Sequence, residues 1–168
     1  MSKWQRILKH RLVDEADARR ALGDAALQRL QERVRASERL HSGEIRICVE
    51  ASLPLSYLWR NASARQRAVA MFGKLRVWDT EHNNGVLIYL LLAEHAIEIV
   101  ADRGINRLVP PAQWAELAAR MAAAFRERRF AEGLAAAVDE VHALLVTHFP
   151  LAPGAANPNE LPDTVVVR

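Results

Sequence analysis

NNGVLIYLLLAEHAIEIVAD, residues 83–102, decides the fold of this chain. Asn83-Asn84-Gly85 is a strong turn signal, and residues 86–92 are then apolar at every position, which is typical of a strand covered on both faces. Residues 93–95 form a link so short that residues 96–102 must return as an antiparallel partner. We therefore expect a hairpin whose first strand is central in a sheet.

The sequence before the hairpin predicts helices around one more strand. Residues 14–40 have helical periodicity, with a break at Gly23-Asp24 where Asp24 caps a second helix. Residues 44–50 alternate in polarity, which predicts a strand with one face less apolar than the other. Ser63 and Gln66 have capping-box spacing, so a third helix is expected to begin near Ala64.

The last third is predicted to be helical. Pro111 suits a first helical turn, and apolar stripes run through residues 114–125 and 134–145 on either side of a break at 126–133. After Pro150 the composition turns to Pro, Asn and Ala, with residues 164–167 as a potential edge strand. We expect a three-layer α/β/α sandwich with a small mixed central sheet, N-terminal helices and an extended C-terminal tail. A two-layer α+β arrangement is the alternative.

Composition fits one domain of 168 residues and 18.8 kDa. We divide it into a basic amphipathic leader (1–12), an α/β domain (13–149) and a tail (150–168). The lone Cys48 excludes an internal disulfide and is expected to be a buried, inert thiol. No apolar run is long enough to span a bilayer as a helix, and no secretory signal is evident. These features predict a cytoplasmic protein, or one peripheral on the inner face of the membrane.

Positive charge is concentrated in the leader. Residues 1–12 hold four basic residues and no acid, whereas 19 basic and 20 acidic residues remain in the rest of the chain. A nearly neutral body argues against nucleic acid as a partner. The leader places Trp4, Ile7, Leu8 and Arg11 on one helical face. It is expected either to dock on an anionic membrane or a protein partner, or to pack on its own domain. The predicted contact residues are Lys3, Trp4, Arg6, Lys9 and Arg11.

A candidate metal site lies at the end of the hairpin. If the hairpin turn is centred on Glu94, facing residue numbers sum to about 188, which brings the loop 79–84 beside residues 102–106. The oxygen-bearing side chains there suit a hard cation such as calcium; they are Asp79, Asn83, Asn84 and Asp102. Alternatively, these residues only cap turns.

Other polar residues near this end have open roles. Arg103 is expected to hold an anionic group or to pair with an acid. His82 is either an acid–base group or a solvated loop residue, and Glu50 joins the site only if the first strand runs in the right direction. The chain has no P-loop, GxGxxG, HExxH or Gly-x-Ser-x-Gly motif.

Several segments resemble the TPM domain family, which is named from a thylakoid lumen phosphatase-like group. The matching stretches are Val13-Asp14-Glu15-Ala16, His41 to Glu50, Asn83 to Leu90 and Val100 to Ile105. The resemblance implies an α/β/α sandwich, a divalent-cation site often associated with calcium, and acid phosphatase activity in some members. Many relatives have a signal peptide and a transmembrane segment, whereas this chain resembles a short bacterial branch without them.

The chain departs from the family pattern at the cation site. Asn83 stands where the family usually has an acidic residue, and Asn106 stands where it has a glutamate. Loss of two negative charges lowers the expected calcium affinity, although Asp102, where the family has glycine, compensates in part. The sequence therefore favours a non-catalytic binding or interaction module associated with a membrane assembly. The alternative is a calcium-dependent, acid phosphatase-like hydrolase in which Asp79 and Asp102 hold the ion and Arg103 holds phosphate.

Overall fold

A four-stranded mixed sheet lies at the centre of the computed structural model, which describes residues 2–168. The strands are ordered β3-β2-β1-β4. β1 runs parallel to both β2 and β4, whereas β2 and β3 form the antiparallel hairpin. Their bounds are Ile45–Glu50 (β1), Val86–Leu91 (β2), Ala96–Ala101 (β3) and Val166–Val167 (β4).

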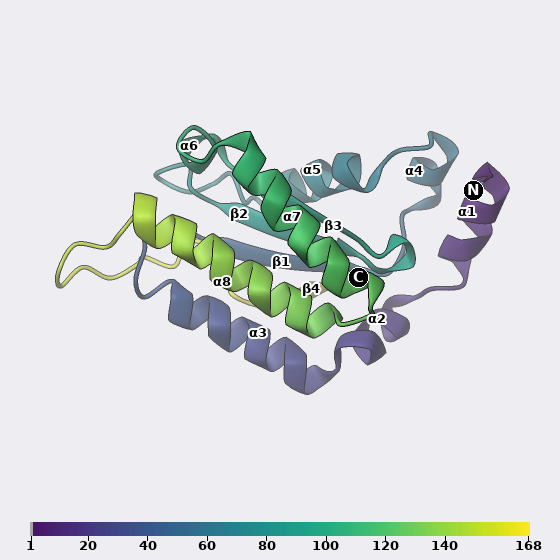
Figure 1. Cartoon of the computed structure of the whole chain (residues 1–168), viewed down its shortest axis with the longest axis horizontal. Helices are drawn as coiled ribbons and strands as arrows, with labels where there is room; N and C mark the ends of the chain where they lie inside the picture. Colours follow the sequence, from purple (N-terminus) through teal and green to yellow (C-terminus); the bar gives the residue numbers. More distant parts are fainter. Residues whose placement is uncertain (1) are drawn as a thin grey trace.

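Helices cover both faces of this sheet, so the predicted three-layer sandwich is confirmed (Figure 1). α2, α3, α7 and α8 pack on one face, and α4 and α5 pack on the other. The helical elements are α1 (Lys3–Arg11), α2 (Glu15–Leu22), α3 (Asp24–Ser37), α4 (Leu55–Trp59), α5 (Ala64–Lys74), the 3-10 turn η1 (Leu92–Glu94), α6 (Arg103–Asn106), α7 (Pro111–Arg126) and α8 (Phe130–His148).

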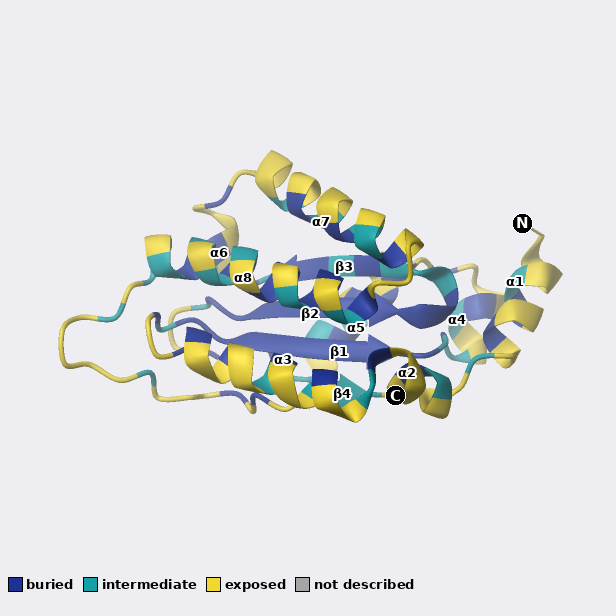
Figure 2. Cartoon of the chain, turned by 60° about the horizontal axis from the view of Figure 1, so that its bottom comes forward, coloured by how far each residue is buried: buried dark blue, intermediate teal, exposed yellow. Residues whose placement is uncertain are grey.

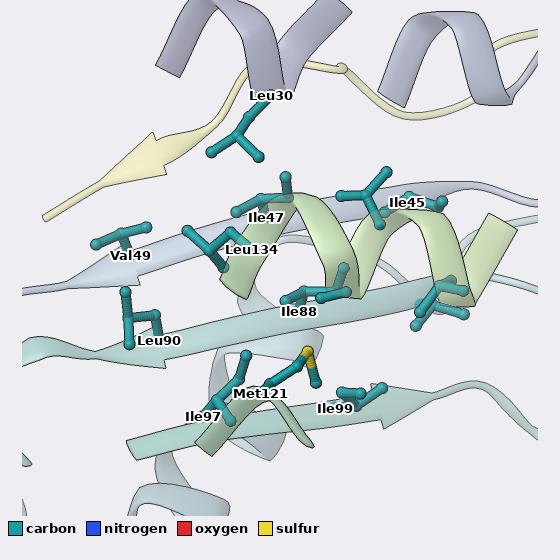
Figure 3. Close-up of a cluster of buried hydrophobic side chains, with 14 of the residues drawn as sticks. Leu30, Ile45, Ile47, Val49, Ile88, Leu90, Ile97, Ile99, Met121 and Leu134 are labelled. Carbon is teal, nitrogen blue, oxygen red and sulfur yellow. The ribbon is translucent and has the colours of Figure 1, made fainter. Parts of the chain in front are cut away.

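The central strand β2 supplies both hydrophobic cores. Val86, Ile88 and Leu90 point towards α7 and α8, where they meet side chains such as Leu134 and Met121 (Figure 3). The intervening residues Leu87, Tyr89 and Leu91 enter the second core, under α5. No residue of β2 has any exposed surface (Figure 2). The run of apolar residues therefore corresponds to a strand that is covered by helices on both faces of the sheet, as the sequence predicted.

The less apolar face of β1 lies on the α5 side and carries a buried ion pair. Arg67 of α5 donates to both carboxylate oxygens of Glu50, at 2.8 and 2.5 Å, and the Tyr89 hydroxyl donates to the same carboxylate at 2.6 Å. All three residues are at most 4% exposed. Because two buried charges need full hydrogen bonding to offset their desolvation, the bidentate geometry is required for this cluster to be tolerated.

The hairpin register differs by one residue from the predicted one. Val86 faces Ala101, so facing numbers sum to 187 rather than 188. The difference arises because the link is a 3-10 turn closed by His95 in the left-handed conformation, with φ of 49°. Asp102 consequently falls just beyond the strand, where it becomes the N-cap of α6.

The helix break occurs at the predicted place but with a different cap. Gly23 adopts a φ of 77° and is both the C-cap of α2 and the N-cap of α3. This left-handed backbone favours glycine. Asp24 is the first residue of α3 and not its cap, although its charge still suits the helix N-terminus.

The C-terminal tail is fixed to the body by buried carboxylates as well as by β4. Glu44 accepts the backbone N–H groups of Glu160 and Leu161 at 3.1 and 3.2 Å. Glu38 accepts the N–H of Ile45 at 3.0 Å and lies beside Asp163. Burial raises the pKa of Glu38 to about 9 from an ordinary 4.5, so this carboxyl is protonated in the folded protein at neutral pH.

The substitution Glu38→Gln is expected to stabilise the protein above about pH 5. Between pH 4.5 and 9 the folded state keeps a proton on Glu38 that the unfolded state loses, so the wild-type free energy of unfolding falls as pH rises. A glutamine does not titrate, and the variant should be more stable at pH 8 by at least about 1 kcal/mol. Urea denaturation at pH 5 and pH 8 measures the effect.

Glu32→Gln, at an exposed position of α3, the helix whose C-cap is Glu38, is the matched control and should follow the wild type. Equal pH slopes for the wild type and Glu38→Gln would contradict the assignment of Glu38 as a neutral buried acid.

Candidate functional site

The loop before β2 and the start of α6 meet at one end of the sheet, as the sequence predicted. The N–H of Asp102 donates to the carbonyl of Gly85 at 2.9 Å, and the N–H of Gly104 donates to the carbonyl of Asn83 at 2.8 Å. These two bonds join segments that are about twenty residues apart in the chain. The convergence follows from the hairpin, because β2 begins where β3 ends.

Gly104 allows this close approach. A Cβ atom at Gly104 would lie 2.3 Å from the carbonyl oxygen of His82 and 2.5 Å from that of Asn83. Both neighbours are backbone atoms, which cannot turn aside as a flexible side chain can. The two segments would therefore have to separate to accommodate any other residue at this position.

Asn84 and Asp102 each bury one oxygen without a hydrogen-bond donor among residues 2–168. Asp102 uses Oδ1 to accept the N–H of Arg103 at 2.7 Å, which leaves Oδ2 unpaired. Asn84 is fully buried; its Nδ2 donates to Ser42 at 3.3 Å and its Oδ1 is unpaired. A buried acceptor without a donor costs roughly 1–3 kcal/mol, so a ligand that pairs with these oxygens would recover free energy.

Asp79 and Asn83, the other two predicted ligands, are bound to arginines. The carboxylate of Asp79 accepts from Arg76, and Asn83 Oδ1 accepts from Arg103 Nε at 3.0 Å. Within the described chain, no group of three or more His, Cys, Asp or Glu side chains is placed to hold a metal ion. A cation at this site would therefore need amide and backbone oxygens in addition to Asp102.

Two further candidates lie apart from these oxygens. His82 is exposed in the loop and contributes its backbone carbonyl at the Gly104 contact. Glu50 faces Leu91 in the parallel pair, at the opposite end of β2 from Gly85. The direction of β1, which the sequence leaves open, thus places Glu50 in the ion pair with Arg67 and outside the candidate cation site.

The leader forms α1 and is fixed to the domain along one side. Ile7 and His10 are buried, and Arg6 donates to Glu94 at 2.6 Å and to the carbonyl of Ala62 at 2.7 Å. His10 accepts the N–H of Leu53 through Nδ1, so its Nε2 carries the proton and donates to Glu94 at 2.9 Å. Hydrogen bonds from His10 and Arg6 lower the pKa of Glu94.

The opposite side of α1 exposes a second apolar stripe. Trp4, Leu8 and Leu12 are 68%, 61% and 74% exposed, and their spacing of four places them on one side of the helix. The single face predicted from the sequence is therefore wrong: Ile7 points into the domain while Trp4 and Leu8 point away from it. Met1, the first residue of the predicted leader, lies outside the described residues.

α4 extends this stripe into what we call the N-terminal patch, made of Trp4, Leu8, Leu12, Leu55 and Trp59. Leu55 and Trp59 are about half exposed. The Trp4 and Trp59 rings meet edge to face with centroids 5.7 Å apart, and Lys3 Nζ lies 4.7 Å from the Trp59 centroid. The contribution of α4 could not be predicted from the sequence, because no local pattern links Trp4 to Trp59, more than fifty positions apart.

A family model matches most of this sandwich. The model of the TPM domain covers residues 15–144. The chain belongs to the TPM domain family. Its fold is shared with the BA42 protein from the psychrophilic bacterium Bizionia argentinensis, with 26% identity, a TM-score of 0.74, and 86% of this chain and 94% of that one covered.

A second TPM-like fold is the N-terminal domain of a protein from P. gingivalis, at 20% identity and a TM-score of 0.62, with 83% of this chain and 94% of that one covered. Among curated proteins, none matches the chain. In the part of this TPM domain that the structure describes, no helix is both long enough and apolar enough to cross a membrane.

Gly104→Ala is expected to destabilise this TPM domain by roughly 1–3 kcal/mol, because the new methyl group meets two backbone carbonyls. Gly73→Ala is the matched control. Gly73 lies in α5 with no atom within 4 Å of the added Cβ. Because alanine lowers the backbone entropy of the unfolded chain, this variant should be more stable than the wild type by roughly 0.5–1 kcal/mol. Chemical denaturation of the two variants measures these opposite signs, and equal stability of Gly104→Ala and wild type would contradict the tight contact.

Proposed function

We propose that this TPM domain is a non-catalytic binding module that docks on an anionic membrane surface through the N-terminal patch. The observation that carries the proposal is that α1 is buried on one side and exposes apolar residues on the other. One side is anchored by Ile7, His10 and Arg6, and the other presents Trp4, Leu8 and Leu12 to solvent on a helix that the domain already holds in place.

The chemistry of the patch matches the interface of a bilayer. Burying a large apolar side chain is worth roughly 1.5–3 kcal/mol, and tryptophan favours the headgroup region because its ring has an apolar body and a polar N–H. Three of the four predicted cations, namely Lys3, Lys9 and Arg11, are exposed on the same helix as Trp4 and Leu8. Each adds about 1 kcal/mol near an anionic leaflet. Arg6 forms an ion pair with Glu94 and so anchors α1 to the domain.

Leu8→Asp is expected to weaken binding to vesicles of phosphatidylcholine and phosphatidylglycerol by tenfold or more, because it removes an apolar contact and adds a negative charge. Vesicle co-sedimentation measures the bound fraction, and added salt should weaken wild-type binding. Leu108→Asp changes another half-exposed leucine outside the patch and should bind as the wild type does. Wild-type protein that stays in the supernatant with anionic vesicles would refute the proposal.

A second candidate function is a divalent-cation site with acid phosphatase-like chemistry, as the family resemblance implies. The observation that favours it is the pair of buried, unpaired oxygens on Asn84 and Asp102, since calcium is bound by six to eight such oxygens. Asp79 and Asn83 would join only after release from Arg76 and Arg103. That release would also free Arg103 to hold a phosphate oxygen.

Asp102→Asn tests this candidate without removing the cap of α6, because the amide oxygen still accepts the N–H of Arg103. Calorimetric titration with calcium should give saturable binding by the wild type and at least tenfold weaker binding by the variant, which has lost the charge. Asp139→Asn, on the exposed surface of α8, is the control. If the wild type gives no heat at millimolar calcium, the cation site is absent, and an assay of phosphate release then has no basis.

A further inference from the structure

The outer edge of β3 is an unpaired strand edge. Among the strands of the described chain, β3 has only β2 as a neighbour. The bond from the N–H of Asp102 to Gly85 fixes the alternation of the ladder. Residues 96, 98 and 100 therefore pair with β2, and Ile97, Ile99 and Ala101 direct their N–H and C=O groups outwards. These groups repeat along the edge with the spacing that another strand would match.

A cavity of about 330 Å³ runs along this edge, within the lower range of ligand pockets. Its floor is β3, and its walls come from opposite layers of the sandwich, with Arg65 of α5 on one side and α7 on the other. α7 passes over β3, which lies at the margin of the sheet (Figure 2). Small side chains, Ala115 and Ala118, leave room between α7 and the strand.

Hydrogen-bonding groups in this cavity are only partly used. Arg65 donates to the outward carbonyl of Ile99 and lies 3.7 Å from Glu98. Trp114 lines the same cavity, and its Nε1 is buried without an acceptor among residues 2–168. Burial also raises the pKa of Glu98. An indole N–H without an acceptor costs free energy in the unliganded protein, and a ligand in the cavity that brings an acceptor to it would recover that free energy.

We propose that this cavity binds an extended peptide segment, which adds to β3 as a fifth strand. A peptide main chain alternates donors and acceptors and thus pairs at once with the outward N–H groups and with the carbonyls that Arg65 leaves free, whereas a small molecule would satisfy one or two of them. A peptide carbonyl also supplies the acceptor that Trp114 lacks. Because Arg65 and Glu98 balance each other, the best segment is uncharged and rich in β-branched residues.

This peptide site is separate from the N-terminal patch, which lies on α1 and α4 and shares none of the cavity residues. Its test therefore does not depend on membrane binding. A negative result for one proposal leaves the other unaffected.

The test is an NMR titration of the full chain with the capped peptide acetyl-Thr-Val-Thr-Val-Thr-amide. The amide signals of Ile97, Ile99 and Ala101 and the indole signal of Trp114 should move and saturate. Hydrogen exchange of the three amides should slow at least tenfold in the complex. The matched peptide with proline at the central position lacks one N–H and should bind at least tenfold more weakly.

Two variants distinguish peptide binding at the edge of β3 from non-specific binding. Trp114→Phe removes the indole donor, keeps an aromatic ring and should weaken binding several-fold. Ala101→Pro removes an outward N–H at an edge position, where proline is tolerated, and should abolish the shifts at the edge. The proposal is overturned if millimolar peptide leaves the three amides unmoved, if Trp114→Phe binds as tightly as the wild type, or if the shifts appear at β4 instead.

Discussion

The rest of this structure depends on the burial of β2 on both faces. A strand without an exposed side chain has to be covered by helices above and below, which requires a third layer. It also has to be paired on both edges, because its backbone groups cannot reach water. β1 and β3 meet this requirement in opposite directions, and the sheet is mixed as a result. The positions of α5, α7 and α8 follow from the same need to cover one six-residue strand.

The sequence predicted the features that depend on neighbouring residues. The capping box of Ser63 and Gln66, the helical start at Pro111 and the doubly covered strand need only local geometry, and the structure contains all three. The predicted hairpin register was off by one residue because the link consists of the 3-10 turn η1 and its cap His95, and so short a link does not specify its own turn type. At the candidate cation site, the sequence predicted which segments converge but not which oxygens remain free.

What the sequence could not supply are contacts between distant segments. Arg6 pairs with Glu94, and Trp4 meets Trp59. Both contacts join α1 to segments more than fifty residues away. A helical wheel of α1 alone contains neither contact, and it therefore predicted one common surface for Ile7 and Trp4. The two proposed functions also acquire a spatial relation only in the structure. α1 and α4, which carry the N-terminal patch, lie at one end of the molecule and α6 lies at the other (Figure 1). β2, roughly 20 Å long, separates η1, where Arg6 of α1 is bound to Glu94, from the end at Gly85 that holds the unpaired oxygens. A domain lying on a bilayer through α1 would present its other end to the aqueous phase.

The reactivity of Cys48 reports how often the folded structure opens. Cys48 sits in the middle of β1 between two paired strands, without exposed surface, and burial raises the pKa of its thiol to about 12. A neutral thiol that no reagent can reach does not react in the folded state. Alkylation of this single thiol therefore proceeds only when the layer of α4 and α5 that covers it opens. The rate of thiol labelling then measures how often the core around β1 opens from the native state, and the measurement needs no added fluorophore or engineered site.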